Sequence, residues 1–256
     1  MTLDKPPTLG GFFVLTTVHR RLTRFHKRNR ERKETMGFGP IMQMKVGELT
    51  IELAPLSKEV MGEFVRPGMQ QHSVVKFLHT PVQVLENEEE WYDANRKDDK
   101  KLLWGIWVVD EGKKTVIGTT SLFDINRGVT YQATTGSMIF RKEYWGKGIA
   151  KHIHMARTWY GFKHMGLDRM MSAVIQGNVA SLRALQNTGY DLVYVERNTH
   201  FTDGKVFHQD NLECLNPNDP FWSNWWHGDR PTKRMVEARK RTRAAMEWAE
   251  QNVKLL

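Results

Sequence analysis

The sequence predicts a mixed α/β fold, with helices on the faces of one mixed sheet. Strand-type segments at residues 102–109 and 115–123 flank an Asp-Glu-Gly turn, and those at 191–201 and 205–215 flank Asp203-Gly204, a pair typical of hairpins. Between these hairpins, a strand-type segment, a glycine-bearing bend and a long helical pattern follow one another. Hydrophobic content of 40% and charged content of 26% exclude a largely disordered chain.

The first half of the predicted fold follows a break at Gly37-Phe-Gly-Pro40. Apolar residues alternate after this break, which favours a strand, and the second helical pattern that follows is rich in acidic residues. In order, we expect a strand at 44–55, helices at 56–66 and 86–97, and strands at 102–109, 115–123 and 133–140.

The second half alternates between helices and strands. Gly166 and Gly189 each stand just past a helical pattern, where a left-handed residue commonly ends a helix. In order, we expect a helix at 149–164, a strand at 169–175, a helix at 178–187, and strands at 191–201 and 205–215. Beyond Pro231, apolar residues at a spacing of three to four predict an amphipathic, basic helix.

Basic residues are concentrated near the two ends of the chain, which has a net charge of +9. Residues 1–44 contain nine Lys and Arg against three acidic residues, and residues 229–243 contain seven against two. Basic termini attract polyanions, so RNA or a ribosome surface is one expected partner, and simple solubility is the alternative. The aromatic cluster at 221–226 is expected to anchor the C-terminal extension, with a wall over the acceptor site as the alternative.

Composition also excludes several other classes of protein. A single cysteine, Cys214, excludes a disulfide framework and a multi-cysteine zinc site. Three histidines at 152, 154 and 164 do not have the spacing of a metal site on one helix face, so we expect no metal. The apolar run at 10–18 is too short to span a bilayer, so we expect a soluble, cytoplasmic protein without membrane contact.

The segment Tyr144-Trp-Gly-Lys-Gly-Ile-Ala150 joins a predicted strand to a predicted helix. Glycines let the backbone approach an anion closely, and the amide groups at a helix start attract one. The pattern is neither a Walker loop nor a dinucleotide fingerprint, because GKS or GKT and the third glycine are both missing. One strand later, Asn178-Val-Ala-Ser181 opens another helix, and Gly189-Tyr190 follows it.

This set of motifs resembles the GNAT acetyltransferase superfamily, and more narrowly the RimJ/RimL ribosomal-protein N-terminal acetyltransferases. The matching residues are 144–150, 178–181, 188–190, Asp203-Gly204 and His208-Gln-Asp210. The resemblance covers about residues 45–215, leaving a basic extension at 1–44 and a helical one at 216–256. It implies a mostly antiparallel mixed sheet that is splayed where acetyl-CoA binds, with helices on both faces.

The resemblance also implies roles for individual residues around acetyl-CoA, the expected cosubstrate. The backbone of Met138, Ile139 and Phe140 would hold the pantetheine arm, and Asn178 would bond to it. The amides of the glycine loop would hold the diphosphate, and those residues are Trp145, Gly146, Lys147, Gly148, Ile149 and Ala150.

Acyl transfer to an amine needs a proton acceptor, oxyanion donors and an acid for the thiolate. The superfamily's usual tyrosine is replaced by Leu185, so Ser181 is our candidate acid, with the backbone near Ile139 as oxyanion donor. His208 and Asp210 share a strand face, and we expect them to act together as the general base. The other candidates for the base are Thr134, His152, Glu196 and a water relay.

The resemblance favours a protein N-terminal α-amine as the acceptor. A small amine such as an aminoglycoside or a polyamine is the runner-up. The alternative from another class is a non-catalytic GNAT-fold module that binds RNA or ribosomes through its basic termini. A homodimer is left open.

Overall fold

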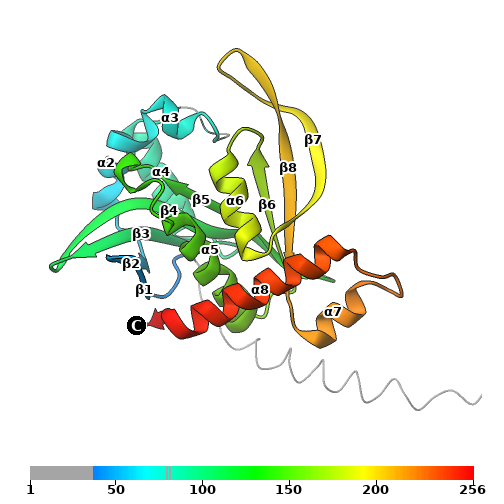
Figure 1. The fold of residues 1–256 in the computed structure, drawn as a ribbon. Coiled ribbons are helices and arrows are strands. Elements are labelled where there is room, and N and C mark those ends of the chain that lie inside the picture. The colour runs from blue at the N-terminus through cyan, green and yellow to red at the C-terminus, as the bar shows by residue number, and fades with distance from the viewer. Residues whose placement is uncertain (1–36, 79, 81) are drawn as a thin grey trace, which may run out of the picture. The chain divides into compact units, whose positions relative to one another are not determined.

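The computed structural model describes residues 37–78, 80 and 82–256, so most of the basic segment expected at 1–44 lies outside it. Its strands form one sheet in the order β7-β8-β6-β5-β4-β3-β2-β1-β9 (Figure 1). Among these strands only β5 and β6 run parallel, which confirms the mostly antiparallel mixed sheet. The strands are β1 (Met42–Val46), β2 (Leu49–Ala54), β3 (Leu102–Asp110), β4 (Lys113–Arg127), β5 (Tyr131–Ile139), β6 (Arg169–Ile175), β7 (Asp191–Thr202), β8 (Lys205–Leu215) and β9 (Lys254–Leu255).

Helices cover both faces of the sheet, as expected. The first group is η1 (Lys58–Val60), α2 (Met61–Glu63), η2 (Phe64–Met69), α3 (His72–Val75) and α4 (Leu85–Asn95). The others are η3 (Lys142–Tyr144), α5 (Ile149–Trp159), η4 (Tyr160–Met165), α6 (Val179–Thr188), α7 (Asp219–Trp225) and α8 (Lys233–Asn252). In Figure 1, α5, α6 and α8 lie together in front of the sheet.

Strand β5 shows how the two faces differ, because its side chains alternate between two cores. Ala133 and Ile139 join the core that includes Ile149 of α5. Met138 and Phe140 face the other way, into the core around Phe64 of η2. We call these the α5 face and the α2–α4 face of the sheet.

Two predicted elements were wrong. Residues 44–55 do not form one strand but a hairpin, because Gly47 adopts φ +58° in the two-residue turn between Val46 and Leu49. The helix predicted at 56–66 is a series of short helical turns that ends at Met69. The helix ends at Gly166 and Gly189 are confirmed, since both residues adopt the left-handed conformation.

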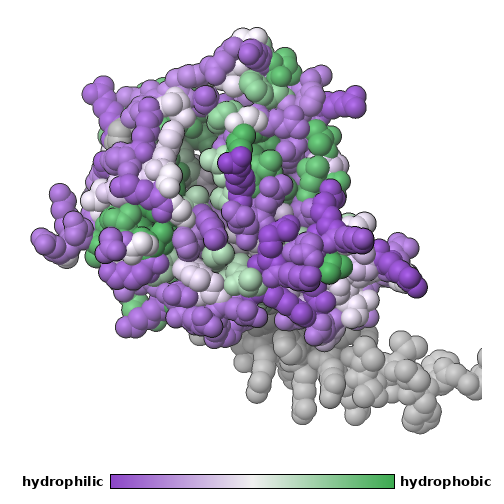
Figure 2. Space-filling model, viewed as in Figure 1, coloured by the Kyte–Doolittle hydropathy of each residue, from purple (hydrophilic) through white to green (hydrophobic). Residues whose placement is uncertain are grey.

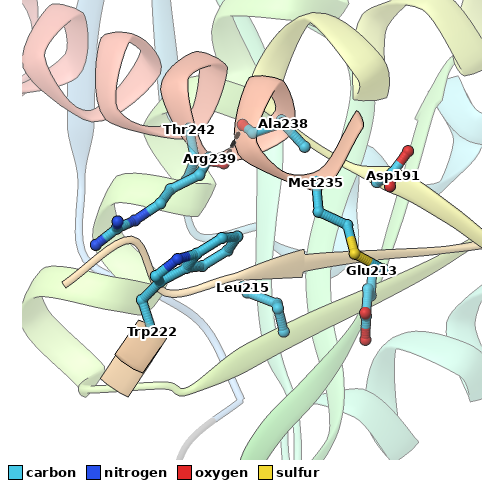
Figure 3. Close-up of a pocket in the computed structure, with 9 residues that line it drawn as sticks. Asp191, Glu213, Leu215, Trp222, Met235, Ala238, Arg239 and Thr242 are labelled. Atoms are coloured by element: carbon cyan, nitrogen blue, oxygen red, sulfur yellow. Dashed lines mark hydrogen bonds between the residues drawn. The ribbon is translucent and has the colours of Figure 1, made fainter. Parts of the chain in front are cut away.

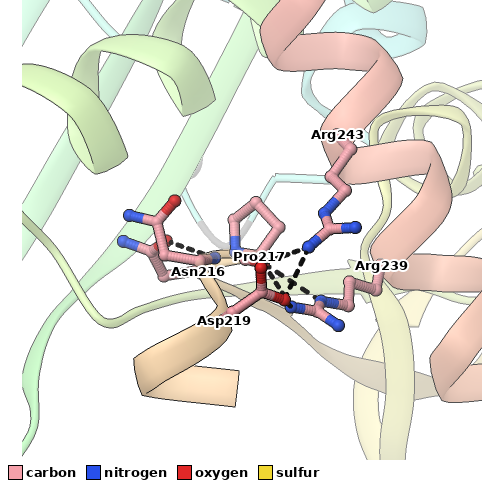
Figure 4. Close-up of polar contacts among 6 residues, drawn as sticks. Asn216, Pro217, Asp219, Arg239 and Arg243 are labelled. Carbon is pink, nitrogen blue, oxygen red and sulfur yellow. Dashed lines mark hydrogen bonds and ion pairs between the residues drawn. The ribbon is translucent and has the colours of Figure 1, made fainter. Parts of the chain in front are cut away.

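Within the C-terminal extension, two arginines of α8 join this helix to the segment at the start of α7. Arg239 and Arg243 both donate to the carbonyl of Pro217 and to the carboxylate of Asp219, at distances from 2.6 to 3.4 Å (Figure 4). The Arg239 guanidinium also lies 4.7 Å from the centre of the buried Trp222 ring. The aromatic segment at 221–226 therefore contacts α8.

His154 of α5 should make the protein sensitive to acid. It is 4% exposed, and burial together with the charge of Arg157 holds the pKa of its imidazole well below the usual value. The unfolded chain binds this proton more readily, so stability present above pH ~6.5 should be lost below it, by at most about 1.4 kcal/mol per pH unit.

Replacing His154 by Phe should remove this component of the acid sensitivity. Urea unfolding at pH 7.5 and 5.5 measures it, with His227→Asn at an exposed position as the control. A His154→Phe protein that loses as much stability between the two pH values as the control would contradict this assignment.

Candidate active site

The centre of the sheet contains a gap between β5 and β6. These strands pair only from Gln132↔Arg169 to Thr134↔Met171. Beyond that point β5 continues along β4, and β6 continues along β8. Two neighbouring strands therefore separate and leave facing edges of backbone groups, which is the splay that the resemblance implied.

Alternation along β5 determines which peptide groups face this gap. The Tyr131 carbonyl accepts from the Asp168 amide toward β6, whereas the Phe140 amide donates to Ile117 on β4. Because successive residues point to opposite edges, Ile139 and Ser137 face the gap and Phe140 does not. The Ile139 carbonyl accepts the indole N–H of Trp145 at 2.8 Å, which leaves the Ile139 amide directed into the gap.

The glycine loop lies between η3 and α5. Gly146 and Gly148 adopt φ +75° and +77°, and a Cβ added at Gly146 would meet nothing within 4 Å. Gly148 is the N-cap of α5, so no side chain caps the first amides of this helix, and its first turn contains no acidic residue. Open backbone at a positive helix end fits a diphosphate.

At the start of α6, one side-chain oxygen is used to cap the helix itself. The side-chain oxygen of Asn178 accepts from the Ser181 amide at 3.2 Å, which leaves the Asn178 amide nitrogen and the Ser181 hydroxyl for a ligand. Leu185, where a tyrosine was expected from the family, is buried in the core. Tyr190 is fully buried, and burial raises the pKa of its phenol, so it is a poor proton donor.

The candidate base residues His208 and Asp210 have separate partners. His208 Nδ1 accepts from the Asn198 amide at 3.1 Å, and Asp210 accepts from the side chain of Gln176 at 2.8 Å. The regular pairing of β8 with β6 places both on the same face as Leu212, which is part of the core on the α5 face. They therefore lie on the side of α6.

A second polar group on β7 and β8 points the other way. Gln209 donates at 3.3 Å both to Glu196 and to Asn211, and the three share the α2–α4 face with Thr134 of β5. The Asn211 amide nitrogen is buried without a hydrogen-bond partner within the described chain. Glu196 was among the sequence candidates, but Gln209 and Asn211 were missed. The alternation of side chains along β8 would have placed these two on one face, opposite the face of Leu212.

Several other features of the described residues lie outside the groups described above. A pocket between α8 and the start of β7, lined by Asp191, Met235 and Thr242, has a volume of about 20 Å³, room for about one water molecule (Figure 3). Figure 2, drawn in the view of Figure 1, shows a hollow beside α6. Within the described chain, no group of three or more His, Cys, Asp or Glu could hold a metal. No described helix is both long and apolar enough to cross a membrane.

Comparison with known proteins gives consistent results. Residues 50–191 match a family model described as acetyltransferase (GNAT) domain. The Bacillus subtilis (strain 168) protein named probable N-acetyltransferase YjcK is 29% identical over 128 residues, 50% of this chain and 69% of that protein. Mycobacterium smegmatis RimJ, solved with CoA-disulfide, has a TM-score of 0.61 at 14% identity and covers 85% of this chain and 97% of its own.

Vibrio cholerae spermidine N-acetyltransferase, solved with CoA and spermine, has a TM-score of 0.57 at 18% identity and covers 65% of this chain and 95% of its own. At these identities the structural likenesses show a shared fold. The family model spans more than half of this chain, and it includes the gap, the glycine loop and the start of α6. The chain thus belongs to the GNAT acetyltransferase family and is an acyltransferase that uses acetyl-CoA as its cosubstrate.

Proposed function

We propose that the chain acetylates the α-amine at the start of a protein or peptide. The observation that carries this proposal is a bridge between α3 and the tip of the β7–β8 hairpin. His72 Nε2 lies 2.6 Å from the Asp203 carboxylate, and His200 Nε2 lies 2.8 Å from the Lys76 carbonyl. In Figure 1 the hairpin tip leans toward α3.

The bridge lies on the α2–α4 face, where an acceptor can approach the gap opposite α5. Phe207 of β8 belongs to this face by alternation, and a Cβ added at Gly177 would lie 3.4 Å from both Phe207 and Phe77. The segment after α3 therefore reaches across to β6 and β8. A bridged entrance admits a chain end more easily than the middle of a chain, which must leave in two directions.

Charge on this side does not separate the two kinds of acceptor. Asp203 contacts His72 and Lys76, and Glu63 pairs with Arg141 at 2.6 Å. Helix α4 on the same face carries further carboxylates, among them Glu86 and Glu90, so a polyamine is our second candidate. Similarity to the Vibrio cholerae spermidine enzyme is the observation that keeps it as a candidate.

The chemistry assigns the chain's own groups to binding, orientation and proton transfer. Acetyl-CoA supplies an activated acetyl group, with the glycine loop and Asn178 as its expected holders. The Ile139 amide faces the gap and would donate to the oxyanion. The Ser181 hydroxyl, at the start of α6, would give the thiolate its proton, directly or through water.

Several groups remain candidates for proton acceptor, because an N-terminal α-amine has a pKa near 8 and is partly neutral already. Asp210 keeps a carboxylate on the α6 side of the gap, whereas the Nδ1 lone pair of His208 is used by Asn198. Glu196 lies on the acceptor side and reaches Gln209. We propose that Asp210 or Glu196 accepts the proton through water, with His208 positioning the β7–β8 hairpin.

Contact with RNA or a ribosome depends mainly on the N-terminal segment in this proposal. The arginines of α8 are largely engaged within the protein: Arg234 donates to Asp191 and the Leu192 carbonyl, and Arg241 donates to the Gln186 carbonyl. Residues 1–36, which carry the other basic cluster, lie outside the described residues. The intact glycine loop argues against a module that has lost catalysis.

Gly148→Glu should abolish binding of CoA, because it places a carboxylate where we expect the diphosphate. Gly112→Glu is a matched control, since Gly112 also has a positive φ (+82°) but lies in the β3–β4 turn, where a Cβ would meet nothing within 4 Å. Ligand at a hundredfold its Kd should stabilise the wild type and the control by about 2.7 kcal/mol. Thermal unfolding with and without CoA measures this, and a full CoA shift in Gly148→Glu would refute the loop assignment.

Peptides should be acetylated at a free α-amine at least about tenfold more efficiently (kcat/KM) than at a lysine in a peptide with a blocked N-terminus. Asp203→Ala, which opens the bridge, should reduce this preference. Asp93→Ala is the control, because Asp93 pairs with Lys58 and Arg96 on the surface of α4. If the protein acetylates spermidine efficiently and neither peptide is a substrate, the polyamine alternative replaces the proposal.

A further inference from the structure

The C-terminal helix α8 lies outside the span of the family model yet packs against α5, the helix that starts at the glycine loop. Small residues make this approach close, since Ala245 and Ala249 of α8 and Ala156 of α5 are fully buried. The interface has a polar or aromatic contact near each end of α5. Glu250 bonds to Trp159 and Lys163 at one end, and Trp248 meets His152 at the other.

The contact at the start of α5 continues into the glycine loop. The rings of Trp248 and His152 have centroids 4.7 Å apart. His152 Nδ1 lies 2.9 Å from the Gly148 carbonyl, and because a carbonyl only accepts, Nδ1 must carry the proton. A Cβ added at Gly148 would lie 3.7 Å from the His152 ring. Trp248, His152 and Gly148 therefore form a continuous chain of contacts.

These contacts determine the direction of a backbone amide that faces the expected ligand. The Gly148 carbonyl and the Ile149 N–H belong to one planar peptide group, so fixing the carbonyl also fixes the N–H. The backbone bond from His152 N–H to the same carbonyl is long, at 3.4 Å, so the 2.9 Å bond from the ring is the shorter of the two. Glycine at 148 offers little conformational restraint of its own.

We propose that α8, acting through Trp248 and His152, orients the Ile149 amide and thereby sets the affinity for the diphosphate of CoA. Trp248 and His152 are positioning residues in this account. The inference rests on the proposed role of the glycine loop. It gives the C-terminal extension a function in cosubstrate binding that is separate from any partner of its basic face.

The test compares both ends of the α5–α8 interface. His152→Phe keeps an aromatic ring against Trp248 but removes the donor, and Trp248→Leu removes the ring contact. Each should raise the Kd of CoA about tenfold by isothermal titration, equivalent to about 1.4 kcal/mol. Trp248→Phe should restore affinity to within about twofold. Glu250→Gln removes the negative charge that pairs with Lys163 at the other end and should lower the melting temperature of the ligand-free protein without changing the Kd.

Pantetheine lacks the diphosphate, so its binding should not depend on the orientation of the Ile149 amide. Its binding should weaken only if a substitution loosens the whole cosubstrate site. Its inhibition constant should be the same in the wild type, His152→Phe and Trp248→Leu. An unchanged CoA affinity in His152→Phe, or an equal loss in Glu250→Gln and Trp248→Leu, would overturn the inference. Failure of the wild type to bind CoA would instead overturn the role proposed for the glycine loop.

Discussion

The separation of β5 from β6 is the constraint on which the rest of the site depends. Three residue pairs hold the strands together, and then each follows a different neighbour. An unpaired strand edge inside a sheet leaves peptide groups that need partners, and an extended ligand with amides of its own can supply them. In the sequence, the glycine loop follows β5 and the start of α6 follows β6. The elements expected to bind one cosubstrate therefore meet at the gap between these two strands.

Local signals in the sequence predicted the parts of the site that depend on local geometry. Gly146 and Gly148 adopt the positive φ that only glycine favours, Asn178 caps α6, and Gly166 and Gly189 end their helices. Contacts between distant segments were not predictable in this way. Period-two alternation placed His208 and Asp210 on one face, but only the core around Leu212 decides which face that is. Strand β9, which pairs with β1 from the far end of the chain, gave no local signal at all.

Composition alone does not say which basic residues of the C-terminal extension are engaged within the protein. These basic residues suggested a surface for polyanions, yet Arg239 and Arg243 converge on Pro217 and Asp219. Carbonyl-bound guanidinium groups serve packing as much as recognition. The aromatic contact of Trp248 with His152 links the same helix to the glycine loop.

We propose that the gap between β5 and β6 and the first turn of α5 bind acetyl-CoA. Residue-resolved amide hydrogen exchange with and without CoA is the most direct test. We expect new protection at Ile139, Ile149 and Ala150, and little change at Phe140, whose amide already donates to Ile117. Unchanged exchange at Ile139 and Ile149 under saturating CoA would show that acetyl-CoA binds elsewhere.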